Sequence, residues 1–383
     1  MTRTKAICAL VAVVFVFGAF ASSAVAQVRD PRLSDATEPG SVLVFPKFVR
    51  GFVTVPGEAA AQPRTEFEVG VVCPKGQLCP EGQKVKIRFH YVCGSSEASF
   101  ASSFVCRETD FELFTTVNGK LVFNTEGLLP GNTLAPQPQC DRGYLIAWVI
   151  DTSDRPIKFD GLIGDAVLRE TGTAVGAYTA IPIQADPFLA SGALIGTGPG
   201  DPLFFTGGPG HYQAVTGSFF ADVAFDRAAA AGPPVVGSRT TLLTLLTLDV
   251  RSNRPNYPTF VDLNFYNSNE QLLSTSTEFI CWQEVSLSGI NDGVGGVPLP
   301  APPGAFSINT TLTGPLMNTR KGIVVAGPAE KVPIFGINDI AGAATLLGLV
   351  EVLEGATATT GADRQFFYQM LNDSVPVPTF FIP

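Results

Sequence analysis

Three carboxylates alternate along the segment CRETDFEL, at positions Glu108, Asp110 and Glu112. Residues two apart in an extended strand share a face and lie roughly 7 Å apart. Carboxylates placed in this way can act as the acid and base of a glycosidase or can bind calcium. The preceding segment KVKIRFHYVC presents Lys86 and Arg88 at the same alternation, and cross-strand pairing with them would make the acids structural. We expect this structural role, and a secreted hydrolase is a remote alternative.

The two histidines offer no clear catalytic set. His90 alternates with Lys86 and Arg88, so we expect a solvated or ion-paired side chain; His211 follows the turn-rich GGPG, and we expect it at the surface. A GxSxG nucleophile elbow is absent, and neither histidine has a recognisable local partner for a serine triad. We therefore expect a protein that is not an enzyme.

A second acidic segment, DTSDRPIKFD, contains Asp151, Asp154 and Asp160. Calcium binds oxygen-rich loops in exported proteins, but the spacing of an EF-hand is missing. A turn is the preferred interpretation, so we expect no cofactor, and calcium bound by these three residues is the alternative. Trp148 and Trp282 lie within apolar segments, which favours core packing over a glycan-stacking platform.

The N-terminus has the pattern of a secretory signal peptide over residues 1–26. Arg3 and Lys5 precede an apolar stretch, and Ala24-Val25-Ala26 resembles a cleavage site. Removal of this segment also removes Cys8 and leaves an even number of cysteines, which favours disulfides in an oxidising compartment. These are Cys73, Cys79, Cys93, Cys106, Cys140 and Cys281.

We pair Cys73 with Cys79 first, because they bracket a short loop that contains Pro74 and Gly76. The other four cysteines leave three pairings open. Cys93 and Cys106 are close in sequence, but pairing the charged faces of their strands would point them to opposite sides of the sheet. The choice of Cys93–Cys106 with Cys140–Cys281 is therefore one hypothesis among the three.

Most apolar segments are short, rich in β-branched and aromatic residues, and bounded by turns, as strands are. The 39 glycines and 30 prolines are too many for a helical bundle. Two segments, Leu162–Arg169 and residues 340–353, are candidate helices, and the second is alternatively a buried strand. The fold class expected is all-β: two mostly antiparallel, disulfide-stabilised β-sandwich domains, immunoglobulin-like or jelly-roll-like.

A small-residue stretch at 228–234 predicts a domain boundary. We expect a flexible extension over 27–40, a first sandwich over 41–230 and a second over 235–383. A shift of 175 positions aligns Tyr91 with Tyr266 and Cys106 with Cys281, so the halves are either duplicates or similar by chance.

The C-terminal segment SVPVPTFFIP reads as an edge strand, because Pro376 and Pro378 remove amides from one side of it. Its apolar residues dock on their own domain or add as a strand to a second copy. The candidate residues for strand addition are Val375, Val377, Phe380, Phe381 and Ile382.

The formal net charge of −9 argues against nucleic-acid binding, and no apolar stretch long enough for a membrane helix follows the signal. The sequence thus predicts an exported bacterial envelope or extracellular protein in the periplasm, at the cell surface or free in the medium. Its expected role is structural or interactive, with itself or another surface component as partner. A ligand- or glycan-binding module or adhesin is the alternative.

Overall fold

The computed structural model describes most of the chain after residue 32. The described residues are 33–51, 63–94, 105–127, 135–169, 175–196, 202–224, 239–251, 256–267, 272–286, 321–331, 342–354, 363–367, 369–370, 376–377 and 379–382. The predicted signal peptide and the predicted boundary at 228–234 lie outside these residues.

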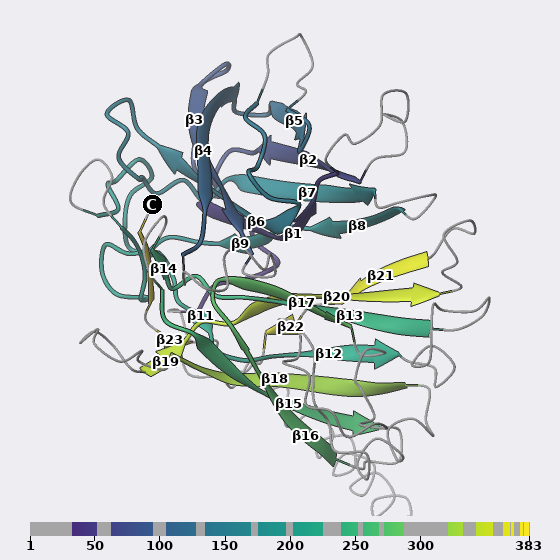
Figure 1. The fold of residues 1–383 in the computed structure, drawn as a ribbon. Helices are drawn as coiled ribbons and strands as arrows, with labels where there is room; N and C mark the ends of the chain where they lie inside the picture. Colours follow the sequence, from purple (N-terminus) through teal and green to yellow (C-terminus); the bar gives the residue numbers. More distant parts are fainter. Residues whose placement is uncertain are drawn as a thin grey trace, which may run out of the picture. The chain divides into compact units, whose positions relative to one another are not determined.

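Two antiparallel sheets from the first part of the chain pack face to face (Figure 1). One has the order β4(Glu108–Thr116), β3(Lys84–Cys93), β6(Arg142–Ile150), β1(Val42–Val49), β9(Ile181–Ile183), and the other has the order β5(Lys120–Asn124), β2(Arg64–Val71), β7(Leu162–Arg169), β8(Val175–Thr179). Aromatic side chains from both sheets fill the core between them; Phe45 and Phe67, for example, meet edge to face with ring centroids 5.2 Å apart. This pair of sheets is the first sandwich.

A second pair of sheets comes from the later part of the chain. One has the order β16(Leu272–Phe279), β15(Thr259–Asn267), β18(Lys321–Lys331), β12(Phe219–Ala224), β22(Gln369–Met370), with β19(Gly342–Ala344) beside β18. The other has the order β17(Trp282–Ser286), β13(Arg239–Leu246), β20(Leu347–Glu354), β21(Asp363–Phe367). Phe219, Leu243, Phe265 and Val350 belong to the core that these sheets enclose, the second sandwich.

A third buried cluster joins the outer face of the β1–β6 sheet to residues of β13, β17 and β20. Strand β6 contributes to two cores, because Leu145, Ala147 and Val149 pack inside the first sandwich while Tyr144, Ile146 and Trp148 pack on the opposite face. A strand buried on both faces needs apolar residues at consecutive positions, which explains the run LIAWVI. Short strands complete this region: β10(Leu203–Phe205), β11(Val215–Thr216), β14(Val250–Arg251), β23(Pro376–Val377) and β24(Thr379–Ile382).

The predicted all-β class is confirmed for the described residues, where the named elements are strands, paired antiparallel except for β14 with β24. The candidate helix at Leu162–Arg169 was wrong, because this segment is β7, with alternating buried and less buried residues. For residues 340–353 the alternative of a buried strand is confirmed in the described part, where β20(Leu347–Glu354) lies between β13 and β21. Among the described residues, none forms a helix long and apolar enough to cross a membrane.

Residues 33–40, the described part of the predicted flexible extension, are hydrogen-bonded to the first sandwich. The Ser34 hydroxyl donates to the Pro182 carbonyl at 2.9 Å, and Gly40 exchanges backbone hydrogen bonds with Leu162. Backbone hydrogen bonds to a folded sheet hold such a segment in place.

Three disulfides link the six cysteines. Cys73–Cys79 is confirmed, with Cα atoms 5.8 Å apart. The hypothesis Cys93–Cys106 with Cys140–Cys281 was wrong, since the structure pairs Cys93 with Cys140 and Cys106 with Cys281. The reason is the opposition of faces noted above: Cys93 packs within the first sandwich, and Cys106 packs in the third cluster with Cys281.

Candidate functional site

A bulge in β1 turns a lysine out of the first sandwich. The register of β1 with β6 shifts between Phe45 and Phe48, and Pro46 and Lys47 occupy the irregularity. Proline donates no amide hydrogen bond to a sheet, so it is accommodated at such positions. The Lys47 side chain is fully buried, which is rare for a lysine without close partners.

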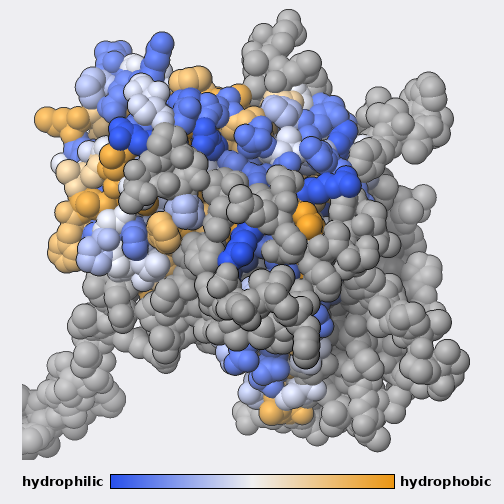
Figure 2. All heavy atoms as spheres, turned by 60° about the vertical axis from the view of Figure 1, so that its left-hand side comes forward, coloured by the Kyte–Doolittle hydropathy of each residue, from blue (hydrophilic) through white to orange (hydrophobic). Residues whose placement is uncertain are grey.

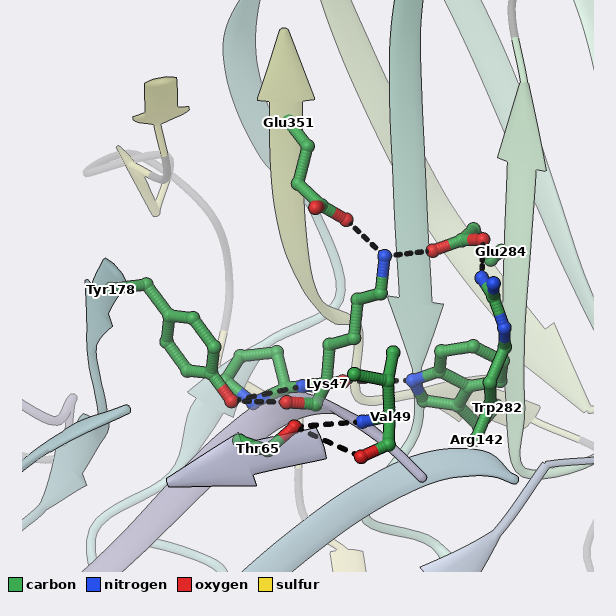
Figure 3. A network of polar contacts seen from close by, with 9 residues as sticks. Lys47, Val49, Thr65, Arg142, Tyr178, Trp282, Glu284 and Glu351 are labelled. Atoms are coloured by element: carbon green, nitrogen blue, oxygen red, sulfur yellow. Dashed lines mark hydrogen bonds and ion pairs between the residues drawn. The ribbon is translucent and has the colours of Figure 1, made fainter. Parts of the chain in front are cut away.

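Two carboxylates from the second sandwich meet this lysine (Figure 3). Lys47 Nζ contacts Glu351 of β20 and Glu284 of β17. The other oxygen of Glu284 contacts Arg142 of β6. Two cations and two anions thus follow one another in the order Glu351, Lys47, Glu284, Arg142, and we call this set the Lys47 junction. It links β1 and β6 to β17 and β20.

Buried polar groups hold the backbone around Lys47. Trp282 Nε1 donates to the Pro46 carbonyl at 2.7 Å, and the Tyr178 hydroxyl donates to the Lys47 carbonyl (Figure 3). Burial raises the pKa of Tyr178 well above its ordinary value, so its hydroxyl remains a donor. Thr65 Oγ1 accepts from the Val49 amide at 2.8 Å. The lysine therefore emerges from a backbone fixed on several sides.

The exposure of the four charges decreases inward. The Arg142 side chain is 35% exposed and Glu284 is 14% exposed, whereas Lys47 and Glu351 are both at 0%. Ions removed from water carry a large desolvation penalty, which only close and well-oriented partners offset. Lys47 and Glu351 therefore depend more on their ion pair than Arg142 and Glu284 do.

A cavity of about 390 Å³ adjoins the junction. Its walls come from Pro46, from the stretch 177–182 and from Gly348 and Leu349. This size suits a small molecule, since ligand pockets in proteins span roughly 300–1,000 Å³.

The alternating acids of β4 lie beside the cations of β3. Arg88 lies opposite Glu112, and His90 lies opposite Asp110. Arg88 Nε donates to Glu112 at 3.1 Å, and Lys86 Nζ lies 2.6 Å from the same carboxylate. Asp110 is exposed and Glu108 contacts His90, so the three acids point to different partners.

His90 lies in a buried position. The side chain was expected to be solvated or ion-paired; it contacts Glu108 but is only 3% exposed. Its ring stacks on Trp148 at 4.5 Å between centroids, and Phe381 of β24 meets its edge at 5.9 Å. Burial, together with the nearby charge of Arg88, lowers its pKa to about 3. A solvated His90 was the wrong expectation, because Phe381 of the C-terminal segment packs against its ring.

His211 lies against Phe204 and the Thr206 hydroxyl. The rings of His211 and Phe204 stack at 4.9 Å, and His211 Nδ1 is 2.7 Å from Thr206 Oγ1. Thr206 also accepts a hydrogen bond from the Gly208 amide. The arrangement closes the turn that the sequence GGPGH predicts.

Each of the three calcium candidates has a partner from the chain. Asp151 accepts two hydrogen bonds from the Arg155 guanidinium, Asp154 contacts Lys86, and Asp160 accepts from the Ala185 amide at 2.9 Å. Within the described residues, no group of three or more His, Cys, Asp or Glu side chains is arranged to hold a metal ion.

The two tryptophans pack in the core. Trp148 and Trp282 are at most 1% exposed and lie in the third cluster.

The C-terminal segment lies against its own chain. Strand β24 runs between β10 and β14, and β23 pairs with β11. Phe381 is fully buried against Trp148 and His90. Val377, Phe380 and Ile382 lie on these strands, and Val375 is outside the described residues.

Sequence reasoning missed the Lys47 junction. Its signal is present in the printed sequence, because Lys47 interrupts SVLVFPKFV and Glu351 interrupts LLGLVEVLE, two otherwise apolar segments. A single charge within a buried apolar run requires a partner. The two segments are 304 residues apart, so the partner could not be identified by local pattern.

Comparisons with known proteins give no family. No protein-family model matches the chain, and no curated protein matches it significantly. A solved structure of a presumed secreted protein from Parabacteroides distasonis ATCC 8503 matches with 7% identity over 84% of this chain and 92% of that chain, at a TM-score of 0.17.

Proposed function

We propose that this protein is an exported, non-enzymatic structural or interaction protein of the bacterial envelope or extracellular space. The proposal rests on the Lys47 junction, in which charged side chains of β1 and β6 in the first sandwich contact charged side chains of β17 and β20 in the second. Cys106–Cys281 adds a covalent link between the same parts of the chain. Disulfides are typical of exported proteins, because the bacterial cytoplasm keeps thiols reduced.

An interaction role is further supported by exposed apolar side chains. Leu78, Phe114 and Phe188 are each more than 60% exposed. Figure 2 shows hydrophobic surface at the left of that view next to hydrophilic surface. Exposed apolar surface takes part in contacts between proteins where it forms a contiguous patch.

Imaging and sizing test the structural role. Mature protein, with and without residues 375–383, is examined by electron microscopy and size-exclusion chromatography. Ordered assemblies would support self-assembly, and their loss on truncation would show that they need the C-terminal segment, whose β24 is already paired on both edges within its own chain. Monomers in both samples would refute assembly and leave interaction with another surface component, tested by fractionation of the native host.

A ligand-binding module is the second candidate, and the cavity beside the junction favours it. Thermal shifts with calcium, EDTA and a glycan panel test this function. The matched variant is Ala177→Trp, which places a large side chain at an exposed residue of the cavity wall. A stabilising ligand whose effect disappears in this variant would support binding there, and a flat response to the panel would contradict it.

A further inference from the structure

An amine and a carboxyl group lie in contact inside the protein without access to water. The Lys47 and Glu351 side chains are both 0% exposed, and Lys47 Nζ contacts Glu351 Oε2. The same nitrogen also contacts Glu284 Oε2. A lysine thus faces one fully buried carboxyl group and a second carboxyl group that is close to the surface.

Burial changes the reactivity of the Lys47 amine and of the carboxyl groups that it contacts. Removal from water disfavours the charged forms of both amine and carboxyl. A neutral amine is a nucleophile and a protonated carboxyl is an electrophile, so the proton distribution favoured by burial is also the reactive one. Fixed contact between the reacting groups replaces the entropy loss of a bimolecular encounter.

The structure points to a covalent bond, and we propose that Lys47 and Glu351 form an intramolecular amide cross-link. The Lys47 nitrogen attacks the Glu351 carbonyl carbon (Cδ) and forms a C–N bond. Glu284 accepts a proton from the nitrogen and delivers it to the departing hydroxyl group. The C–O bond breaks and one water molecule leaves, so no oxidant or other co-reactant is needed.

The two glutamates have different roles because their surroundings differ. Glu284 contacts both Lys47 Nζ and Arg142, so its carboxyl group lies where it can take a proton from the nitrogen and return it. Glu351 is deeper and at 0% exposure, which suits the protonated acceptor. The charges balance, since a neutral amine and a protonated carboxyl group give a neutral amide and water, and Arg142 stays paired with Glu284.

The cross-link would close a loop of 304 residues between β1 and β20. This inference goes beyond the structural role proposed above, because it assigns a self-catalysed modification. The intact mass of the chain tests the cross-link independently of whether the protein assembles.

The test is the intact mass of folded mature protein after reduction and denaturation. We expect a mass about 18 Da below that of the sequence, the loss of one water molecule. Protein that has never folded and is kept in urea from its isolation onward is expected to show the full sequence mass. It should lose this water only upon refolding. Tryptic digestion should join the peptide 33–50, which contains Lys47, to the peptide 332–364, which contains Glu351.

Substitutions identify the reacting atoms. Glu351→Gln is expected to lose about 17 Da, because ammonia replaces water as the leaving group. Lys47→Arg should show no loss, and Glu284→Gln should slow the reaction. Lys120 and Glu68, an exposed ion pair at 2.8 Å, serve as the internal control and should remain unlinked.

The full sequence mass in wild-type protein after prolonged incubation in the folded state would overturn the proposal, even if no variant folds. A water loss that persists in Lys47→Arg, or a peptide joined through Glu284, would overturn the assignment as well.

Discussion

Replacement of Lys47 by methionine removes the central cation of the junction while keeping a long side chain. Glu351 then remains buried at 0% exposure without its ammonium partner. Removal of one member of a buried ion pair destabilises proteins by about 3–5 kcal/mol, because the remaining charge keeps its desolvation penalty. Loss of the proposed Lys47–Glu351 amide adds about 6 kcal/mol in the chain-entropy model for a loop of 304 residues.

The matched control is Lys120→Met at the protein surface. The Lys120 side chain is 59% exposed and its ion pair with Glu68 is open to solvent, so we expect a change within about 1 kcal/mol. The double variant Lys47→Met/Glu351→Leu should recover part of the stability lost by Lys47→Met, because it also removes the buried carboxylate.

Urea unfolding followed by tryptophan fluorescence measures these differences. The chain has two tryptophans, and Trp282 donates to the carbonyl of Pro46, directly beside Lys47. Equal unfolding midpoints for Lys47→Met and Lys120→Met would refute the importance of the junction. No recovery in the double variant would refute the explanation by a buried charge.

Three further predictions concern neighbouring contacts. Burial alone would raise the pKa of Glu112, but hydrogen bonds from Lys86 and Arg88 lower it below 4.5, so the Glu112 carboxylate stabilises the fold above about pH 4.5 and this contribution is lost below it. The variant Glu112→Gln should therefore lose less stability in acid than the wild-type protein. Parallel stability curves for the two proteins in urea titrations at several pH values would contradict this. Replacing Cys106 and Cys281 by serine opens a loop of 175 residues and should lower the free energy of unfolding, measured by calorimetry, by about 5 kcal/mol. The same replacement of Cys73 and Cys79, which close a loop of six residues, should lower it by about 2 kcal/mol. A larger loss for the shorter loop would contradict the explanation by loop entropy. Phe381→Ala should destabilise the protein by about 3–5 kcal/mol and speed cleavage near the C-terminus by proteases; unchanged proteolysis would show that β24 does not dock at Trp148.

Local pattern was sufficient for the strands and for the shortest disulfide. The alternation in KVKIRFHYVC placed Val85, Phe89 and Cys93 on the core face, as the structure shows. It failed where distant segments decide the environment. His90 has the position of a surface residue, but β24 arrives from nearly 300 residues away and covers it.

Residues 340–353 left a helix and a buried strand open for a related reason. A strand buried on both faces loses the polar alternation that identifies strands, so β20 reads equally well as an apolar helix. The Lys47 junction likewise depends on which segments fold together, and a charge in an apolar run predicts only that some partner exists. Cys106–Cys281 joins segments 175 residues apart, and no local rule selects that pair.

Scanning calorimetry of the oxidised wild-type protein tests most directly the claim that the Lys47 junction and Cys106–Cys281 join the two sandwiches into one structural unit. We predict a single transition, with equal calorimetric and van't Hoff enthalpies, as expected for cooperative unfolding. Two independent transitions in the wild-type protein would contradict it.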